Sequence, residues 1–335
     1  MYNVNIMYYT KRGFKIMIEA NKILDEIFNV DYYTRVQNLR DSDLKLAHYT
    51  SASVALEIIK NKEIWLNNVG NMNDYQEVIT GKNLLAKTFN ETEEGKRLKS
   101  ILNQISDKLA EELIVRYNTT FNTLDKTYAF CLTEHKKDYD KYGRLSMWRA
   151  YAPKNGVALV LNIEPFIGDT NKTKACTLPM FYYDYDEFQN KFKNFVDKID
   201  DNLNIFKNFP KQNILNYFYI KFLVSVLSLK HKGFKEEKEW RILCNEFIYG
   251  KDTVIDEDIK NVMGVPRIIK TLNFDSLNDE NSGYSTKLND ILYKIIIGPS
   301  DNPEQLRDIF IKKLDENDVV DAEKKVVISE IPVRI

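Results

Sequence analysis

One stretch of the chain constrains the fold more than any other, because the spacing of its apolar residues changes several times within it. Residues 45–77 read KLAHYTSASVALEIIKNKEIWLNNVGNMNDYQE. Apolar and polar residues alternate at its start, apolar residues then recur at helical spacing, and a short apolar run precedes a polar end. The stretch therefore predicts a strand, a short helix, a second strand and a turn-rich loop.

The first predicted strand carries His48 near its end, one of only three histidines in the chain. Tyr49 and Thr50 follow it and could present hydroxyl groups and backbone donors to a polar ligand. A histidine at a strand end is more often a hydrogen-bonded structural residue, so two interpretations of His48 stay open. Asn73, in the polar loop, either contributes to the same site or only forms a turn.

The composition excludes several classes of protein. The 48 Lys and Arg residues nearly balance the 49 Asp and Glu residues, and the formal net charge of -1 provides no general attraction for nucleic acid or anionic lipid. A local basic patch is compatible with this balance. No apolar run is long enough to span a bilayer, and no secretory signal is evident. The three dispersed cysteines fit a reducing compartment. We therefore expect a cytoplasmic protein with no membrane partner.

Strand-like segments occur early, in the middle and at the end of the chain, for example at residues 127–133, 156–162 and 293–297. Helical patterns separate them, and the strands must pair across long stretches of sequence. The sequence thus predicts one α+β domain with a mixed, mostly antiparallel sheet and an inserted helical layer. We expect this domain to cover residues 44–335 and residues 1–43 to form an extension packed on its core.

The segment EEKEWRILCNE, residues 236–246, is a further predicted strand. Residues two apart in a strand share a face, so Glu237, Glu239 and Arg241 are expected on the face opposite Trp240. One interpretation is a solvent-facing set of ion pairs. The other is a carboxylate held at a cleft, where it would stabilise positive charge that develops in a transition state.

The segment LSMWRAYA, residues 145–152, combines two aromatic rings with a cation on a short predicted helix. Trp148 and Tyr151 are three residues apart and are therefore neighbours on the helix surface. With Arg149 they form either part of the core with an exposed guanidinium group, or a site for a planar ring beside a phosphate.

Common nucleotide and metal motifs are absent from the sequence. It contains neither GxGxxG nor GxSxG, and the residues around Gly81-Lys82 do not complete a phosphate-binding loop. His135 and His231 lack companion ligands at metal-binding spacing. We therefore expect no metal site.

Three sequence blocks, taken in order, resemble a bacterial family catalogued as domain of unknown function 2971. The first is LAHYTS followed by IWLNN, the second is AFCLTE followed by LSMWRAYAPKNGVALVLN, and the third is KHKGFKEEKEWRI. Together they extend over about residues 44–300. The family name implies no activity.

A weaker resemblance carries a function. A histidine on a first strand, a helix, a second strand and a late strand with Glu-x-Glu are similar to the ADP-ribosyltransferase fold. This resemblance implies that His48 holds the ribose of NAD and that Glu239, preceded by Glu237, stabilises the oxocarbenium ion as nicotinamide leaves. Cys131 and Thr133 stand where related enzymes carry Ser-x-Ser, so this chain departs from the pattern there.

The same resemblance implies that Tyr151, or else Tyr49, stacks on nicotinamide and that Arg149 meets the pyrophosphate. The leading hypothesis is an enzyme that transfers ADP-ribose from NAD to a protein or nucleic-acid acceptor, in a toxin or phage-defence setting. In this hypothesis Glu239→Gln abolishes NAD turnover and leaves the fold intact. The alternative is a non-catalytic module that senses a nucleotide or engages a partner protein. The expected nucleotide contacts are His48, Tyr49, Thr50, Asn73, Trp148, Arg149 and Tyr151.

Overall fold

The computed structural model describes residues 31–71, 75–121, 126–152, 154–167, 175–245, 255–262, 264–274 and 287–332. Strands and helices are both abundant in these ranges. Ten strands form one sheet in which most neighbours are antiparallel, and β11 and β12 are parallel. The predicted α+β class with a mixed, mostly antiparallel sheet is therefore confirmed.

The main path of the sheet runs in the order β12-β11-β4-β1-β3-β2-β10-β9. Its strands, in chain order, are β1 (Lys45–Ser51), β2 (Glu63–Asn68), β3 (Thr127–His135), β4 (Gly156–Leu161), β9 (Ile255–Val262), β10 (Val265–Asn273), β11 (Leu292–Ile297) and β12 (Val326–Ile328).

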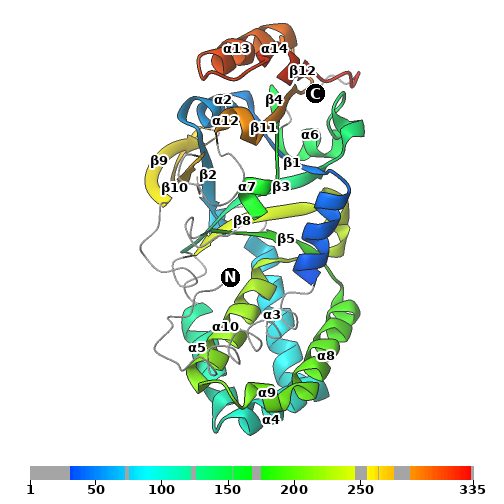
Figure 1. The fold of residues 1–335 in the computed structure, drawn as a ribbon, viewed down its shortest axis with the longest axis vertical. Helices are drawn as coiled ribbons and strands as arrows, with labels where there is room; N and C mark the ends of the chain where they lie inside the picture. The colour runs from blue at the N-terminus through cyan, green and yellow to red at the C-terminus, as the bar shows by residue number, and fades with distance from the viewer. Residues whose placement is uncertain are drawn as a thin grey trace, which may run out of the picture.

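The sheet branches at β3. One edge of β3 pairs with the start of β1 and, at its other end, with β2, and the opposite edge pairs along most of its length with β8 (Glu239–Asn245). Strand β5 (Ala175–Pro179) lies beyond β8. A separate two-stranded piece, β6 (Phe181–Tyr182) with β7 (Leu229–Lys230), follows at this end. β8 therefore connects the sheet to the segments next to the helical layer (Figure 1).

The first strand–helix–strand unit forms as its sequence predicts. Ser51 is the N-cap of α2 (Ala52–Asn61), and its hydroxyl accepts a hydrogen bond from the backbone N–H of Val54. The helix buries its apolar stripe against one face of the sheet. Lys62 ends the helix in the left-handed conformation and leads directly into β2.

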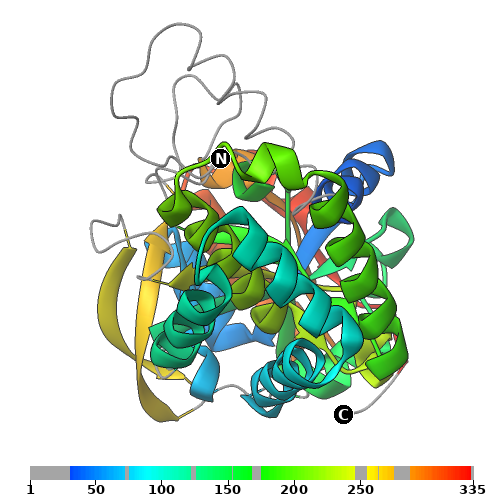
Figure 2. The same cartoon turned by 90° about the horizontal axis from the view of Figure 1, so that it is seen from below.

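Two groups of helices form the layer below the sheet in Figure 1, and Figure 2 shows that they cover this end of the molecule. They pack around a shared apolar cluster that includes Phe89, Leu102, Phe218 and Phe222. The first group comprises α3 (Tyr75–Glu91), α4 (Glu93–Ile105) and α5 (Leu109–Phe121), and the second comprises α8 (Tyr185–Asp201), α9 (Leu203–Phe206) and α10 (Lys211–Leu227).

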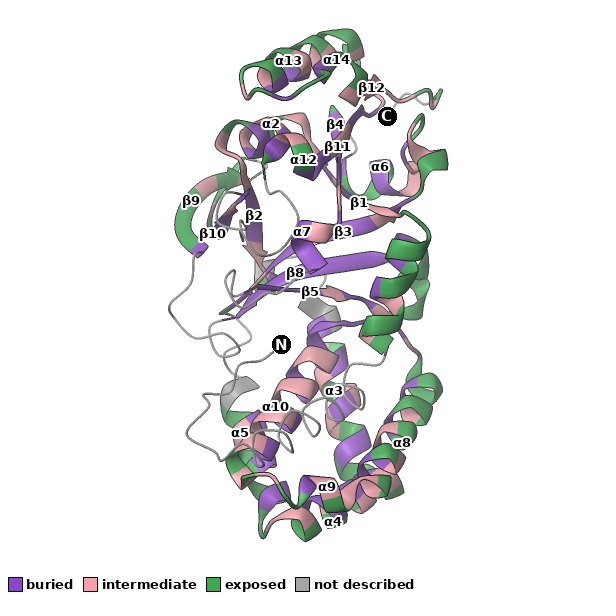
Figure 3. Ribbon diagram, in the orientation of Figure 1, coloured by how far each residue is buried: buried purple, intermediate pink, exposed green. Residues whose placement is uncertain are grey.

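Buried residues concentrate in the strands of the sheet (Figure 3), and the main core includes side chains of α2, α12 and α13. Residues 31–41 form a helix whose Val36 and Leu39 belong to the main core. The stretch from Gln37 to Asp43 is polar apart from Leu39, but its first residues continue this helix because the Leu39 side chain is buried in the core. The remaining elements are η1 (Val69–Asn71), η3 (Lys137–Tyr139), α6 (Leu145–Tyr151), α7 (Glu164–Ile167), η4 (Lys232–Glu237), α12 (Leu288–Ile291), α13 (Pro303–Asp315) and α14 (Ala322–Lys325).

A prediction about stability follows from Gly143, which precedes α6. Its φ of +64° is in the left-handed region, and an added Cβ would lie 2.5 Å from the Trp148 ring. Gly143→Ala should lower the free energy of unfolding by about 2–4 kcal/mol, from backbone strain and overpacking together. Gly264→Ala is the control, because Gly264 has φ +86° with no atom within 4 Å of the added Cβ. Its cost should stay near ~1 kcal/mol in chemical denaturation, and equal costs would contradict the packing argument.

Candidate functional site

The charged side chains predicted on the Glu-rich strand meet in a buried cluster with Lys230. Arg241 donates to Glu239 through Nε at 2.6 Å and through an Nη at 3.1 Å. Lys230 Nζ lies 2.9 Å from the same carboxylate and 2.6 Å from a carboxylate oxygen of Glu237. Two cations thus balance two anions, and we call these four residues the ionic cluster. It neither faces solvent, as the first interpretation of this strand required, nor leaves Glu239 free, as the second did.

Glu237 belongs to η4 and not to the strand, so its predicted position on β8 was wrong. Lys238 adopts a left-handed conformation between η4 and β8, which redirects the chain. The Glu237 side chain nevertheless reaches the cluster, and its other carboxylate oxygen accepts a 2.7 Å hydrogen bond from the Tyr151 hydroxyl. Glu237 is therefore the link between the ionic cluster and α6.

The hydroxyls of Tyr182 and Thr133, together with Arg144, hold the backbone around the ionic cluster through hydrogen bonds. The Glu239 N–H donates to the Tyr182 hydroxyl at 2.7 Å. Arg144 donates to the Thr133 hydroxyl at 2.6 Å and to the Glu237 carbonyl at 3.1 Å. These contacts hold η4, α6 and β6 at fixed positions relative to β8.

The electrostatics of the cluster keep Glu239 ionised. Burial by itself would raise the pKa of Glu239, but the opposing charges of Arg241 and Lys230 outweigh burial and lower this pKa to about 2. Both carboxylate oxygens of Glu239 already accept hydrogen bonds from these cations. The arrangement suits a structural ion pair better than a carboxylate that must contact a substrate.

His48 lies on the other face of the sheet from Glu239. Ala47 is directly opposite Thr133, and Thr133 is directly opposite Glu239, so these three share a face. His48 points the opposite way. Its ring lies 4.1 Å from the Phe130 ring, and Nδ1–H donates to the Cys131 carbonyl at 2.8 Å. Burial lowers the pKa of His48 to about 4, so the imidazole is neutral near pH 7. The structure therefore does not bring the expected His48–Glu239 pair together.

The aromatic residues expected to form one plate also separate. Trp148 is completely buried, and its ring packs edge-on against Tyr49 at 4.6 Å. Tyr151 and Arg149 are exposed. The interpretation of Trp148 and Tyr151 as one exposed aromatic surface was therefore wrong, since of these two rings only Tyr151 is accessible to solvent.

The remaining predicted contacts lie apart from the ionic cluster. Thr50 is directly opposite Val157 on the His48 face of the sheet. The Tyr49 hydroxyl accepts a hydrogen bond from the Arg144 backbone N–H at 2.9 Å, which gives Tyr49 a structural role. Asn73 lies outside the described residues.

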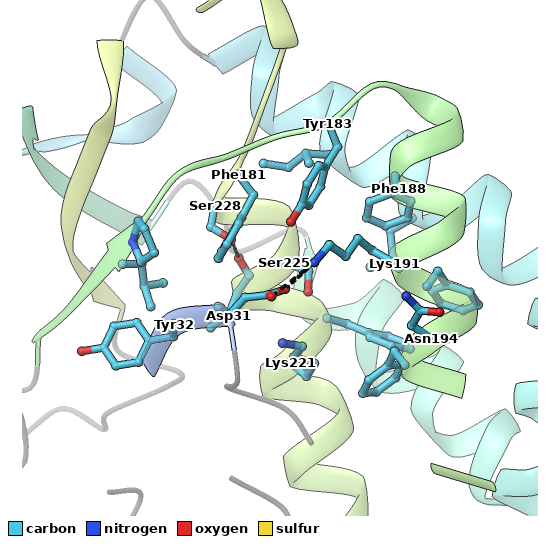
Figure 4. Close-up of a pocket in the computed structure, with 18 of the residues that line it drawn as sticks. Asp31, Tyr32, Phe181, Tyr183, Phe188, Lys191, Asn194, Lys221, Ser225 and Ser228 are labelled. Atoms are coloured by element: carbon cyan, nitrogen blue, oxygen red, sulfur yellow. Dashed lines mark hydrogen bonds and ion pairs between the residues drawn. The ribbon is translucent and has the colours of Figure 1, made fainter. Parts of the chain in front are cut away.

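A cavity of about 410 Å³ opens between α8, α10, β6 and the start of the helix at residues 31–41 (Figure 4). Aromatic rings form much of its wall. Phe181 and Tyr183 are stacked, with centroids 5.9 Å apart and an interplanar angle of 18°. Further rings line it from α8 and α10, namely Phe188, Phe192, Phe195 and Phe222.

Three lysines, Lys191, Lys198 and Lys221, contribute to the same cavity. Lys191 Nζ lies 3.2 Å from a carboxylate oxygen of Asp31, a contact visible in Figure 4. Burial lowers the pKa of Lys221 to about 8, an effect that Asp31 opposes and Lys198 reinforces. The charge of Asp197, another residue of the wall, is matched by Arg97. The lysines therefore add positive charge to a wall that is otherwise largely aromatic.

Lys221 was missed as a site residue, although the sequence contained a signal for it. It is the only charged residue between Lys211 and Lys230, and it stands in the most apolar part of α10. A lone cation in such a run must reach an edge, a partner or a cavity. Lys230 carried no comparable signal, because its partners are brought to it only by the tertiary fold.

Within the described ranges of the chain no group of three or more His, Cys, Asp or Glu side chains is placed to hold a metal ion. No helix in the same ranges combines the length and the apolar character that crossing a membrane requires.

A comparison with models of protein families matches part of the chain. Residues 147–242 match the model of a family described as Protein of unknown function (DUF2971). The matched segment is less than a third of the chain and runs from α6 into β8, so it includes the ionic cluster and most of the cavity wall. No curated protein and no solved structure matches the chain. The match supports the family resemblance over this segment.

A prediction tests the structural role of Glu239. Glu239→Gln should lower the free energy of unfolding by about 3–5 kcal/mol, because it leaves buried cations without a full partner. This outcome differs from the intact fold expected from the sequence. Chemical denaturation measures it, with Glu236→Gln as the control, since Glu236 is the exposed neighbour of Glu237.

The difference in unfolding free energy between wild type and Glu239→Gln should depend on pH. The pKa of Glu239 is about 2 in the folded protein against an ordinary value of 4.5. Its ionised form therefore stabilises the fold above about pH 4.5, by about 3 kcal/mol, and this contribution is lost as the pH falls toward 2. The stability difference between wild type and Glu239→Gln should shrink between about pH 5 and pH 3. A constant difference would show that the charge of Glu239 is not what stabilises the fold.

Proposed function

We propose that this chain is a nucleotide-binding module that senses its ligand without turning it over. The observation that carries the proposal is the convergence of aromatic rings and lysine side chains in one cavity of about 410 Å³. Ligand sites for small molecules typically occupy about 300–1,000 Å³ and combine apolar walls with a few polar anchors. A nucleotide has the planar ring and the negative charge that such a wall would select.

The side chains of the cavity wall suit both parts of a nucleotide, its base and its phosphates. The stacked pair of Phe181 and Tyr183 offers a flat aromatic edge against which a base can pack. Lys221 and Lys198 supply ammonium groups for phosphate oxygens. Ser225 lies one helical turn after Lys221 and also lines the cavity, so it can donate a hydrogen bond on the same side.

The arrangement of acidic residues supports binding without chemistry. In the described part of the cavity wall the carboxylates are Asp31 and Asp197, and each already forms an ion pair. Glu239 is held by two cations within the ionic cluster. A carboxylate in such surroundings contributes to the fold and has little freedom to act on a glycosidic bond.

The binding proposal predicts a specific effect of Lys221→Met. ADP, ATP and AMP should each raise the melting temperature of the wild-type protein, and calorimetry should show the affinity reduced about ten-fold or more in the variant. The melting temperature of each protein without ligand is the reference from which its ligand-induced shift is measured. Lys193→Met, an exposed position on α8 outside the cavity wall, should bind like wild type.

Affinity should also depend on pH through Lys221. Because its pKa is about 8, its amine is mostly protonated at pH 7 and mostly neutral at about pH 9. The terminal phosphate can only gain charge between pH 7 and pH 9, so a fall in ADP affinity as pH rises in wild type must come from the protein, and this fall should be absent from Lys221→Met. Equal pH dependence in the two proteins, or no binding of any of these nucleotides, would overturn the proposal.

A second candidate is the NAD cleavage implied by the ADP-ribosyltransferase-like resemblance. The observation that favours it is the Glu237 carboxylate, which accepts the Tyr151 hydrogen bond beside the surface. Glu237 would stabilise the positive charge on ribose while the glycosidic C–N bond breaks, nicotinamide leaves, and the acceptor forms the new bond. His48 lies on the opposite face of the sheet from Glu239, and this separation argues against NAD cleavage.

The two candidates give opposite results with NAD. The binding proposal predicts no nicotinamide release from purified protein, with or without added lysate or nucleic acid. The second candidate predicts release that falls about 100-fold or more in Glu237→Gln and is retained in Glu236→Gln. Chromatography of the reaction products measures both outcomes, and such a loss would replace the binding proposal with the enzymatic one.

A further inference from the structure

Exposed cations gather around the edge of the sheet where η3, α6 and η4 meet. These segments are adjacent, since the Glu134 N–H donates to the Lys238 carbonyl at 3.1 Å and Tyr151 donates to Glu237. Arg144 also reaches from the start of α6 to the Glu237 carbonyl. We call the exposed cations of these segments the basic patch; they are Lys136, Lys137, Lys141, Arg149, Lys235 and Lys238.

The cations of the basic patch are not neutralised by close acidic partners, although Lys137 acts at longer range on Asp43. None of the six forms an ion pair in the described ranges, whereas Lys96, Lys260 and Lys324 elsewhere each do. The exposed acidic residues of the same segments are Asp138 and Glu236. Because the whole chain has a net charge of -1, this excess of positive charge is local.

Aromatic side chains are exposed among these cations. Tyr142 is 43% exposed, Tyr151 36% and Phe234 43%. Phe234 also lies 4.9 Å above Lys230 Nζ, so the ring stands at the boundary between the ionic cluster and the surface. Exposed aromatic rings are stabilised when another flat or apolar group covers them and removes their surface from water.

We propose that the basic patch binds single-stranded nucleic acid. Such a surface has two components, cations and exposed rings. Ammonium and guanidinium groups bind the phosphates, and the bases stack on the rings. A duplex uses only the first component, since its bases are already stacked inside. This inference rests on a different part of the molecule from the nucleotide cavity and does not depend on it.

The experiment measures fluorescence anisotropy of a labelled oligothymidine and a labelled oligouridine of about 20 nucleotides, each against a duplex of equal length. The full chain should bind the single strands with an affinity that falls steeply with salt, and should bind the duplex at least about ten-fold more weakly. Lys221→Met should bind the oligonucleotides like wild type, which separates this surface from the cavity.

Two sets of variants test the two components. Lys136, Lys141 and Lys235 changed together to Gln should reduce the slope of log affinity against log salt by about 2, at about 0.7 for each lost contact with a single strand. The matched control changes Lys193, Lys207 and Lys312 to Gln, which removes the same charge from other exposed sites. Tyr142→Ala should weaken binding roughly ten-fold, and Tyr185→Ala, a ring of similar exposure, should not.

Three outcomes would overturn the proposal. The first is the absence of salt-dependent binding by wild type. The second is duplex affinity equal to that for single strands, which would leave the exposed rings without a role. The third is an equal loss in the control triple variant, which would assign the binding to net charge and not to the basic patch.

Discussion

Four buried charges at the start of β8 determine how the sheet and the helical layer meet. Removing a charged group from water costs several kcal/mol, so Lys230, Glu237, Glu239 and Arg241 are tolerated in the interior only because each has opposite charges at hydrogen-bond distance. The four residues come from β7, η4 and β8, which are consecutive in the chain but run in different directions. Their mutual neutralisation fixes the geometry of that connection.

The short β6–β7 pair transmits this geometry to the cavity. Phe181 is paired with Leu229 and both line the cavity, whereas the next pair, Tyr182 and Lys230, joins the ionic cluster and its hydrogen bonds. The two sides of one small ribbon thus serve two regions. The position of the aromatic wall depends on the buried charges behind it, and this gives the cluster a supporting role in binding that needs no direct contact with a ligand.

The sequence was informative wherever the signal was local. The unit from β1 to β2, with Ser51 capping its helix, follows from apolar spacing and capping chemistry. The relative placement of His48 and Glu239 was not accessible in this way, because it depends on the registers of β1 and β8 against β3, which pair residues from 86 to 118 positions apart. The left-handed Lys238 likewise moved Glu237 off the strand that its alternation predicted.

Burial limited the prediction of the site as well. The Trp148 ring is of a type that often stacks on ligands. Here the backbone at Gly143 and Gly298 lies close against the ring, which is completely buried. The cavity is formed by α8, α10 and β6, whose mutual positions no local pattern contains. The one local signal for this cavity is Lys221, a single charged residue in the most apolar part of α10.

The most direct measurement of the central claim is a crystal structure of the protein with ADP. The account predicts a nucleotide between α8 and α10, with its base against Phe181 and Tyr183 and a phosphate oxygen within hydrogen-bond distance of Lys221 Nζ. A nucleotide bound instead beside Glu237 and Tyr151, with the α8–α10 cavity empty, would contradict the account and direct attention back to the carboxylates of the Glu-rich segment.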